Sequence, residues 1–109
     1  ATVGLTEIQA KAGGHAVRSD EVLFRTLGKA QVMGALAGQA KLVSDSGTGR
    51  ILGVQIIGPH ATEVIAEATL AVNKGLTVED LVGTIHAHPT LAEIMSETAM
   101  KAADRPLHG

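Results

Sequence analysis

A helical pattern of hydrophobic residues lies in the middle of the chain, over Ala61–Lys74. The apolar positions recur at the spacing that places side chains on one face of an α-helix: Val64, Ala68, Ala71 and Val72. Gly75 follows, and glycine readily adopts the left-handed conformation that ends many helices. The sequence therefore predicts an amphipathic helix that stops at Gly75.

Upstream of this helix, two β-favouring runs flank a short polar segment. The runs are residues 40–44 and Ile51–Ile57, and Gly47 and Gly49 lie between them. Glycine accepts the positive φ that a tight reversal demands, so we expect a β-hairpin. The Gly47-x-Gly49 pair also invites comparison with a dinucleotide-binding loop, but the next glycine, Gly53, comes one residue too late and a strand follows it.

Local signals predict the remaining elements. Thr6 and Gln9 are spaced as a capping box for a short helix that starts at Glu7 and ends at the glycines at positions 13 and 14. Residues 15–24 alternate only in part and suggest a strand or an extended segment. Three expectations concern the second half: a shorter helix capped by Thr77 and running through Leu81 and Val82, a last helix from Thr90 to about Lys101, and a frayed tail at residues 104–109.

This order of elements predicts an α+β fold, with an antiparallel β-sheet that contains a hairpin and packs against helices. The 109 residues show no repeat or linker, so we expect a single domain over residues 1–109. Phe24 is the only aromatic residue, so the core must be built from Val, Ile, Leu and Ala. Such a core favours close backbone packing.

Composition narrows the classes of function. The net charge is −2 and the basic residues are scattered, so neither nucleic acid nor an anionic membrane is an expected partner. No apolar run approaches the ~20 residues of a membrane span, and no signal peptide is evident, which predicts a soluble intracellular protein. The chain contains no cysteine, so any thiol redox role must use sulfur from elsewhere.

Residues 85–93, Ile-His-Ala-His-Pro-Thr-Leu-Ala-Glu, carry the candidate chemistry. Histidine suits proton transfer near neutral pH, which makes His88 the candidate base. Pro89 restricts the backbone after it and permits a cis peptide bond. Glu93 lies five residues on, and a carboxylate bonded to one imidazole nitrogen fixes the tautomer and aims the other nitrogen outward.

Structural alternatives exist for each of these residues. Thr90 and Glu93 are spaced as a capping box, in which the glutamate merely returns to the Thr90 amide, and spacing alone favours this role. His88 could be an ordinary loop histidine. His86 and His88 with Glu93 form a weak metal-ligand set, because alternation in an extended segment would point both histidines the same way but supplies no third ligand at a usual spacing. The remaining histidines are isolated in the sequence and are expected at the surface: His15, His60 and His108.

Three blocks of the sequence together resemble a known family. They are residues 3–7 (Val-Gly-Leu-Thr-Glu), residues 51–58 (Ile-Leu-Gly-Val-Gln-Ile-Ile-Gly) and residues 86–93. In this order they resemble the C-terminal dimerisation domain of dihydrolipoyl dehydrogenases, flavoproteins of the pyridine nucleotide-disulfide oxidoreductase family. Ala92 departs from the serine of many relatives, and the resemblance is looser over residues 27–40.

The resemblance implies a catalytic role for His88 and Glu93. It implies that His88 is the acid/base that deprotonates a dihydrolipoamide thiol, whose thiolate then attacks an active-site disulfide, and that Glu93 orients His88. It also implies that the His88-Pro89 peptide is cis and that both residues lie near the flavin of the partner subunit.

The resemblance further implies a parent enzyme that is a homodimer and uses FAD and NAD. The flavin site, the nicotinamide site and the redox cysteine pair would lie in regions outside this chain, so the chain alone is expected to bind neither cofactor and to be inactive. Its substrate would be a lipoyl group or a lipoyl domain, and its location the cytoplasm, or the mitochondrial matrix in a eukaryote.

Two other classes of function stay open. The start at Ala1 suggests a fragment, whereas a free-standing dimerisation module would keep the fold without the reaction. A His-rich metal-binding module is the other alternative.

Overall fold

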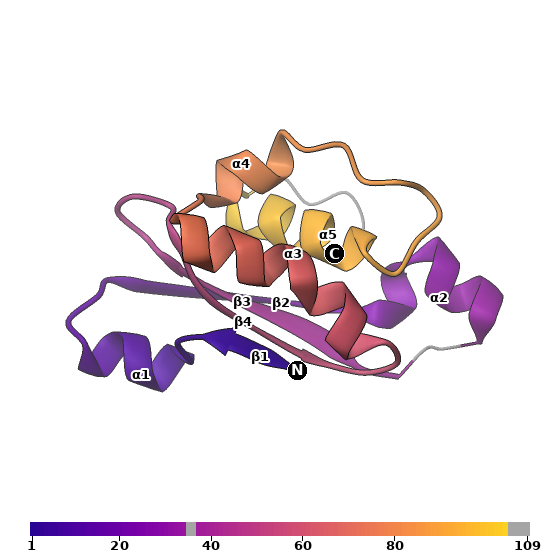
Figure 1. Cartoon of the computed structure of the whole chain (residues 1–109), viewed down its shortest axis with the longest axis horizontal. Helices are drawn as coiled ribbons and strands as arrows, with labels where there is room; N and C mark the ends of the chain where they lie inside the picture. Colours follow the sequence, from indigo (N-terminus) through magenta and orange to yellow (C-terminus); the bar gives the residue numbers. More distant parts are fainter. Residues whose placement is uncertain (35–36, 105–109) are drawn as a thin grey trace.

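The structure is a computed structural model that describes residues 1–34 and 37–104. Along the chain its elements are β1 (Thr2–Gly4), α1 (Glu7–Ala12), β2 (Val17–Leu23), a 3₁₀ turn η1 (Phe24–Thr26), α2 (Gly28–Met33), β3 (Gln39–Asp45), β4 (Ile51–Ile57), α3 (Ala61–Lys74), α4 (Val78–Val82) and α5 (Glu93–Ala102) (Figure 1). The predicted α+β class with an antiparallel sheet is confirmed. None of the helices in the described residues is long and apolar enough to cross a membrane.

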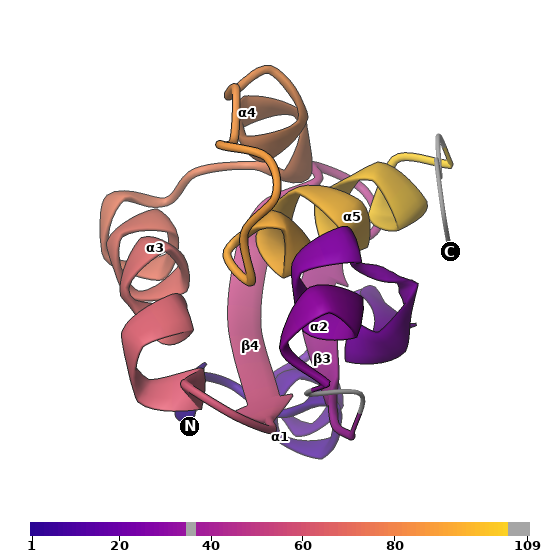
Figure 2. The same cartoon turned by 90° about the vertical axis from the view of Figure 1, so that its right-hand side faces the viewer.

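The four strands form one antiparallel sheet in the order β1-β4-β3-β2. One face is covered by two helices, with α3 packed on β4 and β1 and α5 packed on β2 and β3 (Figures 1 and 2). The short helix α1 lies against the opposite face, where Ala10 packs with Val43 and Leu52. The sheet thus has a large core on one side and a small one on the other.

An irregularity in the hairpin divides the apolar residues of β4 between these two cores. Val43 pairs with Gly53, but Ser44 pairs with Ile51, so Leu52 is the extra residue of a β-bulge. Ile51 therefore joins the main core while Leu52 packs on the α1 side. Strict alternation from Val54 would point Leu52 into the main core and Ile51 to the α1 side, so the extra residue exchanges their faces.

The turn of the predicted hairpin is held by a carboxylate. Asp45 accepts hydrogen bonds from the backbone amides of Gly47 at 2.8 Å and Thr48 at 3.1 Å. Gly49 follows with a φ of 77°, as the sequence predicted for a tight reversal. The amides that a phosphate would need are thus already bonded to Asp45, which excludes the dinucleotide-loop alternative for this turn.

The helix over 61–74 is confirmed at both ends. Gly75 takes the left-handed conformation with a φ of 66°, and its amide bonds back to the last turn. Val64, Ala68 and Ala71 form the buried stripe of α3. Because this stripe is mostly alanine, the helix backbone can approach the sheet closely, as the composition suggested.

One strand and one α-helix escaped prediction, as did the 3₁₀ turn η1, and the start of the last helix was wrong. β1 has only three residues, too few for a period-2 pattern to be visible. α2 lies in the glycine- and alanine-rich region where no pattern indicated a helix. α5 begins at Glu93, because the Thr90 hydroxyl donates to the Ala87 carbonyl at 2.6 Å and does not cap the helix.

The last described residue is well anchored, contrary to the expected frayed tail. Asp104 accepts a hydrogen bond from the Arg18 guanidinium at 2.8 Å, and Arg18 also bonds Asp20 and the Lys101 carbonyl. These contacts tie the end of α5 to β2. Residues 105–109, which were also expected to fray, lie outside the described residues.

We predict that Gly53→Ala destabilises the fold. A Cβ atom at this position would lie 1.9 Å from the Leu5 carbonyl oxygen and 2.7 Å from the Leu5 amide nitrogen, so backbone would have to move. Overpacking of this kind costs about 1–3 kcal/mol in the free energy of unfolding, measurable by urea denaturation. The control is Gly83→Ala, where φ is −76° and the nearest atom lies 3.4 Å away, so stability should change little. Equal effects of the two changes would contradict the close approach at Gly53.

We also predict that the hairpin turn weakens in acid. The amides of Thr48 and Gly47 hold the pKa of the Asp45 carboxyl below its ordinary value of 3.8. The unfolded chain therefore takes up a proton first, and the stabilisation is complete above pH 3.8 and lost as the pH falls through the lower folded value. Thermal denaturation of wild type and Asp45→Asn across this range should show their difference shrinking on acidification. A difference that stayed constant with pH would mean that the charge of Asp45 does not support the turn.

Candidate active site

The segment that joins α4 to α5, residues 83–92, carries the candidate base His88, and we call it the histidine loop. It is anchored at its start by α4, where Thr77 and Asp80 form a capping box. At its end, Leu91 is buried in the main core and Glu93 begins α5. The loop therefore spans the outer side of the helical layer between two fixed points (Figure 1).

His88 and Glu93 are in direct contact, as the sequence suggested. The Nδ1 atom of His88 lies 2.9 Å from Oε1 and 3.0 Å from Oε2 of Glu93. Because a carboxylate accepts, Nδ1 carries the proton in the neutral ring, and Nε2 keeps its lone pair. The His88 side chain is 69% exposed and that of Glu93 only 15%, so the pair presents its imidazole to the surface from a sheltered carboxylate.

The same carboxylate also binds the backbone of the loop just before α5. Oε1 of Glu93 accepts a hydrogen bond from the Thr90 amide at 2.8 Å. The two roles that the sequence left open, the return to the Thr90 amide and the orientation of His88, therefore coexist in one side chain. Only the hydroxyl half of the expected capping box is missing, since Thr90 Oγ1 bonds within the loop.

The surroundings of His88 come from an element that sequence patterns did not reveal. The His88-Pro89 peptide is cis, as the resemblance implied. The start of α2 lies beside it, since a Cβ atom at Gly28 would be 3.7 Å from His88 Cε1. An open cavity of about 390 Å³ lies next to this contact, and its lining includes Pro89, Lys29 and Met33. α2 thus forms one wall beside the histidine loop.

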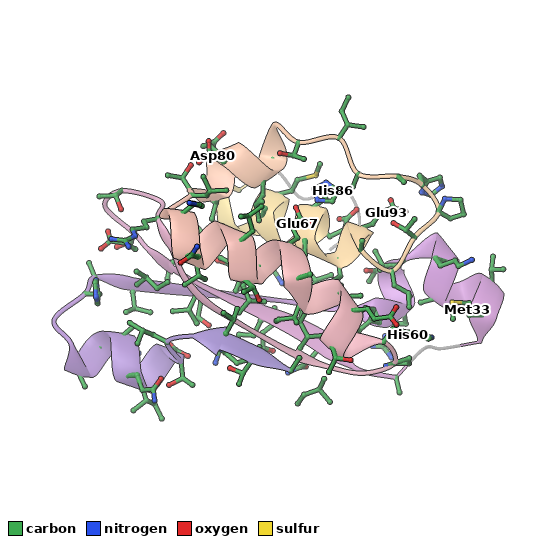
Figure 3. The ribbon with its side chains drawn as sticks, viewed as in Figure 1. Met33, His60, Glu67, Asp80, His86 and Glu93 are labelled. Carbon is green, nitrogen blue, oxygen red and sulfur yellow. The ribbon has the colours of Figure 1, made fainter. Side chains whose placement is uncertain are left out.

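His86 makes a separate contact, with a carboxylate of another helix. Its Nε2 lies 2.6 Å from Oε2 of Glu67 on α3, and its side chain is only 8% exposed (Figure 3). The two histidines thus bind carboxylates from different helices, α3 and α5, although both line one cavity. No three metal-ligating side chains gather as a potential metal site in residues 1–34 and 37–104.

Glu67 is a site residue that sequence reasoning missed. The available signal was its place next to Ala68 on the border of the apolar stripe of α3, where a carboxylate requires a polar partner. Nothing in the local pattern identified that partner, because His86 is 19 positions away.

The other histidines lie outside the candidate site or at its edge. His60 is exposed at the start of α3, as predicted. His15 is exposed but not isolated, since its Nδ1 lies 3.6 Å from Asp45 Oδ2. His108 lies outside the described residues.

The chain resembles known proteins over nearly its whole length. Dihydrolipoyl dehydrogenase of Bacillus subtilis is 46% identical over 108 residues, which cover 99% of this chain and 23% of that protein. The enzyme of the same name from Chlamydia trachomatis is also 46% identical over 108 residues, with the same coverage. The chain thus spans about a quarter of the length of these relatives.

Solved structures share the fold. LpdA from Mycobacterium tuberculosis superimposes with a TM-score of 0.85 at 28% identity, over 92% of this chain and 22% of that one. The HOCl-induced flavoprotein disulfide reductase RclA from Escherichia coli gives a TM-score of 0.84 at 26% identity, over 90% of this chain and 22% of that one. Residues 1–99 match the family described as the dimerisation domain of pyridine nucleotide-disulphide oxidoreductases. This match confirms the predicted resemblance, and the chain belongs to this family of dimerisation domains.

Proposed function

We propose that this chain is the interface domain of a dihydrolipoyl dehydrogenase and that its His88–Glu93 pair is the acid/base of that enzyme. The observation that carries the proposal is the geometry of the pair. A sheltered carboxylate holds Nδ1 of His88, and the ring is exposed with its Nε2 lone pair available in the neutral form. The relatives named dihydrolipoyl dehydrogenase support the choice of enzyme.

In the proposed reaction, His88 Nε2 removes a proton from a thiol of dihydrolipoamide. The resulting thiolate is the nucleophile that attacks a disulfide, since a thiol itself does not react in this exchange. Glu93 stabilises the imidazolium that forms and keeps its Nδ1 proton in place. When the proton returns, His88 acts as the acid.

The sulfur and the electron acceptors would come from outside this chain. The chain has no cysteine, so the redox pair must belong to another region of the parent enzyme, which we place in the partner subunit. FAD and NAD in that enzyme would accept the electrons in turn. The residues on this chain nearest to the flavin would be His88 and Pro89, which the exposure of the histidine loop allows.

A homodimer follows from the same proposal. The family of dimerisation domains to which the chain belongs supports a homodimer, and a two-fold contact would carry His88 to the active site of the partner subunit. Ile85, three positions from His88 on the histidine loop, is 97% exposed, so it would be accessible to a partner subunit. The bacterial sources of the relatives support a cytoplasmic location.

We predict that His88→Gln in the full-length protein carrying this chain lowers turnover of dihydrolipoamide by roughly 10²–10⁴-fold, the usual contribution of a general base. Flavin absorbance should be retained, because His88 donates no bond that the fold requires beyond that to Glu93. His15→Gln, an exposed histidine at the other end of the sheet, is the control and should keep normal turnover.

Near-normal turnover of His88→Gln would refute the assignment of the base. A native protein of only 11.1 kDa without flavin absorbance would instead indicate a free-standing dimerisation module.

We also predict that Glu93→Ala affects both the tautomer of His88 and the start of α5. Without the carboxylate, nothing selects the Nδ1–H form, so ¹⁵N ring spectra should show mixed tautomers where the wild type shows one. Loss of the bond to the Thr90 amide should cost about 1 kcal/mol in the free energy of unfolding. Glu93→Gln retains a carbonyl oxygen that can accept one of the two bonds, so its effects should be smaller. An unchanged tautomer in Glu93→Ala would contradict the orienting role.

A further inference from the structure

We propose that His86 and Glu67 share a proton and thereby hold the histidine loop in the position that His88 needs, so that both are positioning residues. This inference rests on the proposed function of His88 for its catalytic consequence. The contact itself joins two residues of this chain and does not depend on that proposed function.

The two partners of the His86 ring show that an additional proton is present. Nδ1 lies 2.9 Å from the Thr84 carbonyl oxygen, which can only accept, so Nδ1 must carry a hydrogen. Nε2 lies 2.6 Å from Oε2 of Glu67. A neutral ring would then face an ionised carboxylate with its lone pair, which is repulsive. One more proton is required between Nε2 and Oε2.

That proton belongs on the ring. Imidazole is ordinarily a stronger base than carboxylate, so an imidazolium that donates to a carboxylate is the favoured form of the pair. The resulting bond is charge-assisted and short, in keeping with 2.6 Å. The His88–Glu93 pair differs in this respect, because its contact needs only the single proton of a neutral imidazole. Two histidines two positions apart thus have different protonation requirements.

The link connects the loop to a different part of the fold. Thr84, Thr90 and His88 make side-chain hydrogen bonds to partners at most five positions away. His86 reaches 19 positions, to the helix packed on β4 and β1 (Figure 3). The His86 side chain is nearly buried, whereas the side chain of His88, two positions later, is exposed. The His86–Glu67 bond therefore ties the backbone that carries His88 to α3.

The charged groups around His86 include carboxylates from two helices. Glu67 faces it from α3, and a cavity lined by His86 also contains Glu93 and Glu97 of α5, with His88 of the histidine loop itself. These carboxylates come from two helices, so the His86–Glu67 link joins the histidine loop to the helical layer at this point.

Substitutions at Glu67 separate this link from general packing. Glu67→Gln replaces the carboxylate with an amide whose N–H can donate to Nε2 of a neutral His86, so contact persists without the additional proton. Glu67→Ala removes the contact with His86. The matched control for loss of charge is Glu63→Ala, because Glu63 is an exposed residue one turn earlier on the same helix.

The first measurement is the ¹⁵N ring spectrum of His86 at neutral pH. We expect protons on both ring nitrogens in the wild type and in Glu63→Ala, and on Nδ1 alone in Glu67→Gln. A singly protonated His86 in the wild type would overturn the proposal whether or not the chain serves a dihydrolipoyl dehydrogenase.

The second measurement is dihydrolipoamide turnover by the full-length flavoenzyme. Glu67→Ala should lower kcat roughly 10-fold or more through misplacement of His88, and Glu67→Gln should restore most of it. If the wild type turns over dihydrolipoamide and Glu67→Ala does so with an unchanged kcat, the positioning role is refuted while the proposed function stands. Absence of wild-type turnover would refute the proposed function, while the ring spectra still decide the link.

Discussion

Burial of one face of the sheet under α3 and α5 is the constraint on which the rest of this structure depends. The face can be covered closely because the residues at the contact are small, including Ala40, Ala68 and Ala99, all fully buried. With one aromatic residue in the chain, bulk cannot fill a wider gap, so the helices must approach the strands. The position of α5 in turn sets where the histidine loop ends, since Glu93 is its first residue.

The geometry of the proposed catalytic pair is thus a consequence of helix placement. Glu93 is fixed by the start of α5 and by the Thr90 amide before it accepts the bond from His88. The carboxylate is sheltered while the imidazole is exposed, so orientation comes from inside the domain and reactivity faces outward. A pair built in this way suits a base that must act on a group supplied by another chain.

The two histidines of the loop each contact a glutamate, and they illustrate that spacing in the sequence does not predict which partner a side chain binds. His86 and His88 are near neighbours in the sequence, and each has a carboxylate partner. One partner is local and the other lies on a distant helix. Burial separates them further, because the His86 ring is nearly buried and has two hydrogen-bond partners, whereas the His88 ring is exposed and bonds only the Glu93 carboxylate.

The sequence alone predicted much of the fold, because short-range rules control it. The hairpin between β3 and β4 was recognisable from its glycines, and α3 from its apolar stripe and the glycine that ends it. β1 and α2 were not predicted, since a three-residue strand has no visible period and α2 lies among glycines and alanines that suit several conformations. Their existence depends on pairing and packing with distant residues.

The sequence by itself therefore determined the fold class, the family and the proximity of His88 to Glu93, which are separated by only five residues. Only the tertiary structure decided that Glu93 serves the Thr90 amide and His88 together, that α2 lies beside the histidine loop, and that His86 meets Glu67. The physical reason is the separation along the sequence of the residues that interact. Turns, caps and helix faces are set by neighbours in the chain, whereas a contact across 19 positions exists only after the helices have packed on the sheet.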